Sequence, residues 1–282
     1  PHYLIGTALH NTGVVSMWQG KFEEARDALQ RAVAVRCETL PLGHSDVAVS
    51  LVRKGIAHYA LGEWDNSVRD FQKALGICTT ENATRAKILN NLAVVQYQRQ
   101  DFMAALKGLA SALEIQRKWL EDPVRREALV FDTSVTLSNM AKLYLEKRDY
   151  RTAIHVYEES LVLRTTAFRN DSETVLTNLG NLAYAKAMNG EYKKAIQIYR
   201  GILRSQEIRY GAQSSQTMET LGILGFLYIQ HKHDEEALKC LSSVLKWQQT
   251  STTDPHHPCV KHVWDTVKKI EERIQGEVSV WI

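Results

Sequence analysis

The feature that most constrains this chain is a short motif that returns six times. In each copy an aromatic residue is followed three positions later by a small residue and seven positions later by an aromatic residue or leucine. The copies begin at Phe22, Trp64, Phe102, Tyr150, Tyr192 and Asp234, the last lacking the aromatic ring. Successive copies are 42, 38, 48, 42 and 42 residues apart. Self-similarity at such a period is typical of stacked supersecondary units, so a repeat array is predicted.

A second small residue precedes each copy by nine positions. The six residues are Gly13, Gly55, Ala93, Ala141, Ala183 and Gly225. Helical periodicity runs through nearly the whole chain, and few segments alternate as strands do. Two antiparallel helices approach to about 8–10 Å only where small side chains lie at their crossing. Each repeat is therefore predicted to be a pair of helices, A and B, whose small residues meet while the motif aromatics fill the flanks.

The composition fits a protein with a full hydrophobic core and gives no sign of a membrane span. Of 282 residues, 44% are apolar and 24% charged, and the net charge of +3 is too small to indicate nucleic acid. No apolar run approaches the roughly 18 residues that cross a bilayer. The four cysteines are far apart, which favours reduced thiols in the cytoplasm or, alternatively, the nucleus. Because the chain begins with Pro1, we expect it to be part of a longer protein.

The repeated pattern of glycine, then an aromatic residue, then alanine resembles the tetratricopeptide repeat. The glycines stand at 20, 62 and 190, and the period of about 42 residues resembles the repeats of kinesin light chains. Three segments resemble the linkers between those repeats: LPLGHSDVAVSLVRKGIA, RYGAQSSQTMETLGILG and DPHHPCVKHV. The resemblance implies an all-α fold, a right-handed α-solenoid of six tetratricopeptide-like helix pairs with a C-terminal capping helix. The whole chain, 1–282, is expected to form this single solenoid. Its predicted repeats are 5–43, 44–80, 81–121, 122–170, 171–212 and 213–252, followed by the capping helix 258–275.

Capping residues predict where several A helices begin. The candidates are Ser45 or Asp46, Asp171 or Ser172, Ser214 or Ser215, and Asp122 ahead of Pro123. The Asp-Pro pair lies in the longest interval, so the A helix of the fourth repeat is predicted to begin early and to be long. Near the C-terminus, VKHVWDTVKKIEERI carries valine and isoleucine on one face, as a helix that covers the open end of an array requires.

An unusual polar register lies two positions before the small residue of each A helix. Its members are Asn11, Arg53, Asn91, Asn139, Asn181 and Ile223. Asparagine inside a helix costs up to about 0.7 kcal/mol relative to alanine, so four at one register suggest a use. An amide donates and accepts hydrogen bonds at once. The resemblance implies that this register lines a concave groove and that its asparagines clamp an extended peptide. The alternative is that each amide satisfies a carbonyl of the neighbouring A helix and is purely structural.

The predicted peptide-binding residues lie on this groove face of the A helices. They are Asn11, Arg53, Tyr59, Asn91, Val94, Tyr97, Asn139, Lys142, Asn181, Tyr184, Met188 and Phe226. Their mixture of aromatic and cationic groups suits a protein or peptide partner with a hydrophobic anchor and acidic residues.

Catalysis is not expected from this sequence. The motifs GxxxxGK[ST], GxSxG and HExxH are absent, so no catalytic residue and no cofactor is predicted. His256, His257, Cys259 and His262 share one short segment, but linkers of the resembled family carry His-Pro there, so no metal site is predicted.

The leading hypothesis is a scaffold or adaptor that binds linear peptides in its groove. One alternative is a regulatory arm that docks within a longer multidomain protein. Another is an RNA-binding array, which is disfavoured because lysine and arginine are not striped along the A helices. Kinesin heavy chain is not the expected partner, because the heptad segment that light chains use to join it is absent from these residues. No membrane partner is expected.

Overall fold

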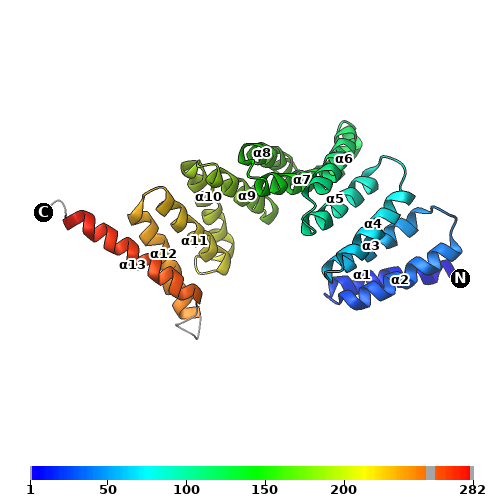
Figure 1. Cartoon of the computed structure of the whole chain (residues 1–282), viewed down its shortest axis with the longest axis horizontal. Coiled ribbons are helices and arrows are strands. Elements are labelled where there is room, and N and C mark those ends of the chain that lie inside the picture. The colour runs from blue at the N-terminus through cyan, green and yellow to red at the C-terminus, as the bar shows by residue number, and fades with distance from the viewer. Residues whose placement is uncertain (1, 252–257, 280–282) are drawn as a thin grey trace. The chain divides into compact units, whose positions relative to one another are not determined.

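The structure of the chain is a computed structural model that consists of helices joined by short connections (Figure 1). It describes residues 2–251 and 258–279, with the side chains of 3–122, 129–250 and 261–274. The thirteen helices of this described part are α1 (His2–Trp18), α2 (Phe22–Thr39), α3 (Ser45–Ala60), α4 (Trp64–Ile77), α5 (Ala83–Gln98), α6 (Phe102–Leu120), α7 (Pro123–Glu146), α8 (Tyr150–Ala167), α9 (Glu173–Met188), α10 (Tyr192–Tyr210), α11 (Ser215–Gln230), α12 (Asp234–Ser251) and α13 (Pro258–Ser279). No strand occurs among these residues, and the predicted all-α solenoid class is confirmed.

The chain divides into two compact units, an N-terminal unit of residues 1–147 and a C-terminal unit of residues 148–282. In the N-terminal unit each helix from α1 to α7 packs on the next one along the chain. The same holds from α8 to α13 in the C-terminal unit. Sequential packing of this kind is what a repeat array predicts, because each helix pair buries its apolar face only against its neighbours.

In the helix pairs that lie within one unit, small residues lie where the two helices cross, as predicted. All six small residues of the A helices are buried, and the small residues of the six motifs are completely buried. The Ser67 hydroxyl donates a 2.7 Å hydrogen bond to the carbonyl of Gly55, so these two positions touch. A Cβ atom added to Gly13 would lie 2.5 Å from Leu29 Cγ, and one added to Gly225 would lie 2.6 Å from Leu241 Cγ. The backbones are therefore closer at these crossings than alanine would allow.

The turn between the two helices of a pair has the same backbone conformation in every repeat. Its left-handed residue stands two positions before each motif. The values of φ are 74° at Gly20, 75° at Gly62, 62° at Gln100, 59° at Arg148, 83° at Gly190 and 61° at Lys232. Glycine adopts this conformation at little cost, which explains why glycine occupies this position in three of the turns. The other three turns hold a residue with a side chain in the same conformation.

The predicted helix starts are correct in most cases and wrong in one. Helix α7 begins at Pro123 and is 24 residues long, which confirms an early start. Ser172 precedes α9, and Ser214 caps α11 by accepting from the amide of Thr217 at 3.2 Å. The prediction of Ser45 or Asp46 as the cap of α3 is wrong, because His44 occupies that position. Its Nδ1 accepts from the amide of Asp46 at 3.2 Å, so an imidazole takes the role expected of a hydroxyl or carboxylate.

Two other expectations are modified by the structure. The motif aromatics do not all fill the core, because Trp64 is 41% exposed whereas the other four are half-buried. Helix α13 continues to Ser279, beyond the predicted end at 275, and buries Val263, Val267 and Ile270 in a cluster that includes residues of α12. Among the described residues, no helix has the length and the apolar character needed to cross a membrane.

Buried arginines tie the end of one repeat to the start of the next. Arg36, in the last turn of α2, donates from Nη1 to the Asp46 carbonyl at 2.8 Å and to Ser50 Oγ at 2.7 Å. Arg164 holds the corresponding place at the end of α8 and donates to the Thr174 carbonyl at 2.7 Å. Each guanidinium thus satisfies a carbonyl in the first turn of the following helix, and this charge-assisted hydrogen bond links consecutive repeats.

Candidate functional site

Five of the predicted peptide-binding residues line one cavity in the N-terminal unit, here called the N-terminal pocket. It has a volume of about 170 Å³ and is lined by Tyr59, Ala93, Val94, Tyr97, Gln98, Leu109, Asn139, Lys142 and Leu143. The lining comes mainly from α3, α5 and α7, which are the A helices of consecutive repeats. Since equivalent positions of stacked A helices lie side by side, the shared register brings these residues together.

The polar groups of the N-terminal pocket are partly satisfied by one another. Asn139 Nδ2 donates to Asn90 Oδ1 at 3.1 Å, so the amide reaches the neighbouring A helix, as the structural alternative expects. The Tyr97 hydroxyl donates to Glu146 Oε1 at 2.9 Å. Burial, followed by this bond to Glu146, raises the pKa of the Tyr97 phenol, which therefore stays a neutral donor. The ring of Tyr97 meets Phe102 edge to face, with centroids 5.8 Å apart.

Lys142 is the one charged residue that lines the N-terminal pocket. It is exposed, and no carboxylate of the lining neutralises it. The pocket therefore combines two tyrosine rings and aliphatic side chains with a single positive charge.

Three other predicted residues of the N-terminal unit lie outside this lining. Asn11 is exposed on α1 and Arg53 is exposed on α3. Asn91 is half-buried on α5, where its neighbour Asn90 makes the bond to Asn139 instead.

A larger cavity, here called the C-terminal pocket, lies among α9, α10 and α11. Its volume is about 420 Å³, and its lining is Glu173, Leu176, Thr177, Gly180, Asn181, Tyr184, Tyr199, Ile202, Gln206, Tyr210, Gln216, Glu219, Thr220 and Ile223. Two predicted residues, Asn181 and Tyr184, are among them. The other residues of the lining were not predicted. Those on α9 and α11 lie on A helices but earlier in the helix than the chosen positions, and those on α10 lie on a B helix, which the register of the A helices does not include. The Tyr199 hydroxyl donates to the carbonyl of Gly180 at 3.1 Å and ties the two helices together.

The last two predicted residues, Met188 and Phe226, lie outside the C-terminal pocket. Both are exposed, at 45% and 40%. The Phe226 ring stacks on the imidazole of His262 from α13, with centroids 6.1 Å apart.

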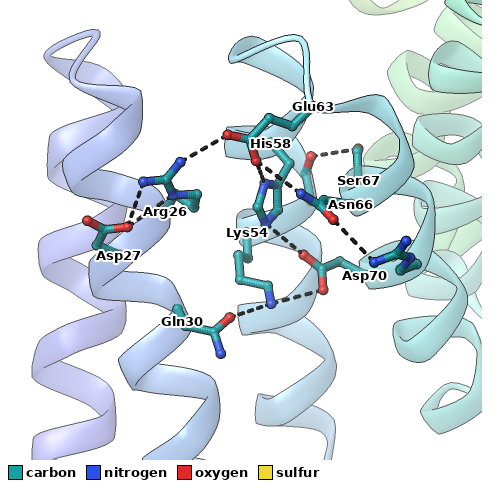
Figure 2. Close-up of polar contacts among 11 residues, drawn as sticks. Arg26, Asp27, Gln30, Lys54, His58, Glu63, Asn66, Ser67 and Asp70 are labelled. Carbon is teal, nitrogen blue, oxygen red and sulfur yellow. Dashed lines mark hydrogen bonds and ion pairs between the residues drawn. The ribbon is translucent and has the colours of Figure 1, made fainter.

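A cluster of buried and half-buried charges connects α2, α3 and α4 and was not predicted (Figure 2). Lys54 Nζ lies 3.0 Å from Asp70 Oδ1 and donates to Gln30 Oε1 at 2.7 Å. His58 stands between Asp70 and Glu63, with Nε2 3.5 Å from Asp70 Oδ2. Arg26 reaches Glu63 Oε1 at 2.9 Å from α2. The side chains of Lys54 and Asp70 are 9% and 5% exposed, so each depends on the other for charge compensation.

Metal ligation has no support among the side chains that the structure describes. No group of three or more histidine, cysteine, aspartate or glutamate residues is placed there to hold an ion. Of the segment considered in the sequence, His256 and His257 and the side chain of Cys259 lie outside the described residues.

Comparison with known proteins places these observations in a family. A model of the tetratricopeptide repeat matches residues 4–80, 46–118 and 132–207. A clustered mitochondria protein homolog of Brugia malayi is 31% identical over 88 residues, which are 31% of this chain and 6% of that protein. This chain therefore spans only a small part of that relative's length.

Solved structures show the same fold at low sequence identity. Kinesin light chain tetratricopeptide-like repeats of Podosopora anserina are 20% identical with a TM-score of 0.61, covering 73% of this chain and 97% of theirs. A signal transduction ATPase of Pyrococcus horikoshii with a tetratricopeptide repeat sensor is 18% identical with a TM-score of 0.74, covering 94% of this chain and 38% of that one. Repeats of this kind generally serve as protein–protein interaction scaffolds and are typically not catalytic. The chain belongs to the tetratricopeptide repeat family.

Proposed function

We propose that this chain is a protein-interaction scaffold that holds a linear peptide on the inner faces of its A helices. The observation that carries the proposal is the convergence of Tyr59, Val94, Tyr97, Asn139 and Lys142 on the N-terminal pocket. These residues come from three successive repeats, so a bound segment would run across the repeats and contact each in turn.

The size and chemistry of the N-terminal pocket favour one side chain of a peptide over a free small molecule. Its 170 Å³ is below the roughly 300–1,000 Å³ of typical small-molecule sites. The tyrosine rings and Val94 would take an apolar anchor, and Lys142 would pair with a carboxylate beside it.

Asn139 has a place in this scheme although part of its amide is occupied. Its Nδ2 donates to Asn90, which fixes the orientation of the amide, and its Oδ1 makes no hydrogen bond to another described residue. That oxygen can accept from the backbone N–H of a peptide whatever the peptide's side chains are. The hydrogen bond to Asn90 is thus compatible with both the structural and the peptide-binding interpretation of Asn139, because it holds in place the amide that would bind the peptide.

A cytoplasmic location fits this role. The described cysteines Cys37, Cys78 and Cys240 are free thiols, as the reducing compartment maintains them. The proposed action is binding alone, with no chemical step.

The test uses peptides selected by display against the chain and measured by fluorescence anisotropy. Asn139→Ala and Lys142→Ala should each weaken a selected peptide about tenfold, because each removes one polar contact with the peptide. Lys107→Ala on α6 is the matched control, because that lysine is exposed outside the pocket. Helicity and melting temperature should stay unchanged in all three. A clear loss of stability in Asn139→Ala with undiminished peptide binding would establish the purely structural role and refute the proposal.

A further inference from the structure

The two pockets differ in the sign of their charge. The charged residues that line the C-terminal pocket are Glu173 and Glu219, and its lining contains no lysine, arginine or histidine. The N-terminal pocket has the opposite pattern, with Lys142 and no carboxylate. A ligand chemistry that suits one pocket is therefore repelled by the other.

Both carboxylates of the C-terminal pocket lack a compensating cation within the part of the chain that the structure describes. Neither Glu173 nor Glu219 has a side-chain ion pair or hydrogen bond there. Other carboxylates of the C-terminal unit are paired, such as Glu158 with Lys186 at 2.8 Å and Glu191 with Lys194 at 2.7 Å. The unpaired charges are thus a property of the pocket and not of the whole unit.

The lining of the C-terminal pocket also contains an amide acceptor and aromatic rings. Gln206 Oε1 is buried and has no hydrogen-bond partner, an arrangement that costs free energy unless a donor reaches it. Burial, followed by the nearby Tyr184 and Glu219, raises the pKa of Tyr199 to about 12. The negative charge of Glu219 therefore reaches Tyr199 in the lining of the pocket. Tyr184 and Tyr210 are 51% and 39% exposed and present their rings at the pocket.

A guanidinium group of the chain itself lies over one of these rings, that of Tyr210. The Cζ atom of Arg209 lies 5.6 Å from the centroid of the Tyr210 ring. Nη1 of the same residue donates to the carbonyl of Asp171 at 3.0 Å, so Arg209 is held there and is paired with neither glutamate.

We propose that the C-terminal pocket binds an arginine side chain of the partner peptide. A guanidinium carries five donors and no acceptor, which matches a wall of two carboxylates and an unsatisfied amide oxygen. Its flat face stacks on tyrosine, which the compact, strongly hydrated lysine ammonium does less well. The 420 Å³ of the pocket accommodates such a long side chain.

This inference deepens the proposed function, since it assumes a bound peptide and gives it a second requirement. The N-terminal unit would select an apolar anchor with an acidic neighbour, and the C-terminal unit would select arginine.

The direct test needs no knowledge of the natural partner. The probe is N-acetyl-arginine methylamide, titrated into the whole chain labelled with nitrogen-15 glycine and followed by nuclear magnetic resonance. Gly180 lines the pocket and should shift with saturation, whereas Gly76 and Gly108 of the N-terminal unit should not. The citrulline analogue, which is neutral and of nearly the same shape, and the lysine analogue should each bind at least about tenfold more weakly.

Substitutions assign the binding to the carboxylates. Glu219→Gln and Glu173→Gln should each weaken the arginine probe about tenfold, whereas Glu207→Gln, an exposed position on α10 outside the lining, should have no effect. Equal binding of arginine and citrulline, or the absence of a saturable shift at Gly180, would overturn the proposal. Its failure is distinct from failure of the peptide groove, because display-selected peptides would then still respond to Lys142→Ala. If the arginine probe binds while no peptide responds to Lys142→Ala, the C-terminal site stands and the proposed N-terminal groove fails.

Discussion

The close crossing of α11 and α12 gives a sharp prediction, because two glycines of α11 differ only in what surrounds them. A Cβ on Gly225 would lie 2.6 Å from Leu241 Cγ and 2.7 Å from Leu241 Cδ2. Leu241 is completely buried, so its side chain cannot move out into solvent to make room. Gly222, one helical turn earlier, has nothing within 4 Å of the same position. The substitution to alanine should therefore stabilise the chain at Gly222 and fail to do so at Gly225.

The magnitudes follow from two opposing effects. Alanine is favoured over glycine within a helix by about 1 kcal/mol. Gly222→Ala should therefore stabilise the chain by about that amount. At Gly225 the same gain is opposed by the overpacking of Leu241, which typically costs about 1–3 kcal/mol. Gly225→Ala should accordingly be neutral or destabilising by up to about 2 kcal/mol, so the two variants should differ by about 1–3 kcal/mol.

Urea unfolding followed by circular dichroism would compare the two variants. Because repeat arrays can unfold in parts, hydrogen exchange of the α11 and α12 amides should accompany it and show whether the change is local. The reasoning is refuted if Gly225→Ala proves as stable as Gly222→Ala, because the helices would then cross with room to spare.

Two further predictions concern the buried charge cluster of Figure 2. Asp70→Asn should destabilise the N-terminal unit by about 3–5 kcal/mol in denaturant melts, because Lys54 then stays buried without its carboxylate. The joint replacement Lys54→Met with Asp70→Leu should recover most of this loss, and no recovery would contradict the pairing. Hydrogen bonds, first from His58 and then from Asn66, lower the pKa of Glu63 in the folded state below its usual 4.5. Glu63 therefore stabilises the fold above pH 4.5, and this contribution is lost as the pH falls through the lowered pKa of the folded state. Glu63→Gln should flatten the acid limb of a stability–pH curve relative to the exposed control Glu38→Gln, and parallel curves would count against it.

Part of the candidate site could be predicted because it depends on register. Once the motif fixed the phase of each A helix, positions two before and one or four after the small residue had to share a face. Asn139, Lys142 and Tyr97 meet in the N-terminal pocket for this reason. The same logic could not find Gln206 or Tyr210, since they come from a B helix whose approach to the groove depends on the angle between helices.

Other features were unpredictable because they depend on burial. Lysine and aspartate inside an amphipathic helix are usually solvated, and nothing local to Lys54 or Asp70 indicates that α2, α3 and α4 enclose both. The cap of α3 is similar, because His44 precedes two better capping residues and only the turn geometry gives it the position.

The sequence alone determined the repeat, its period, its helix pairs and the glycine and alanine positions at their crossings, because these follow from steric fit within about forty residues and recur often enough to be recognised. Tertiary structure decided which charged side chains are buried together and whether the charge of each pocket is positive or negative. Those properties arise where side chains from three helices enter one low-dielectric space, and no single helix contains the information.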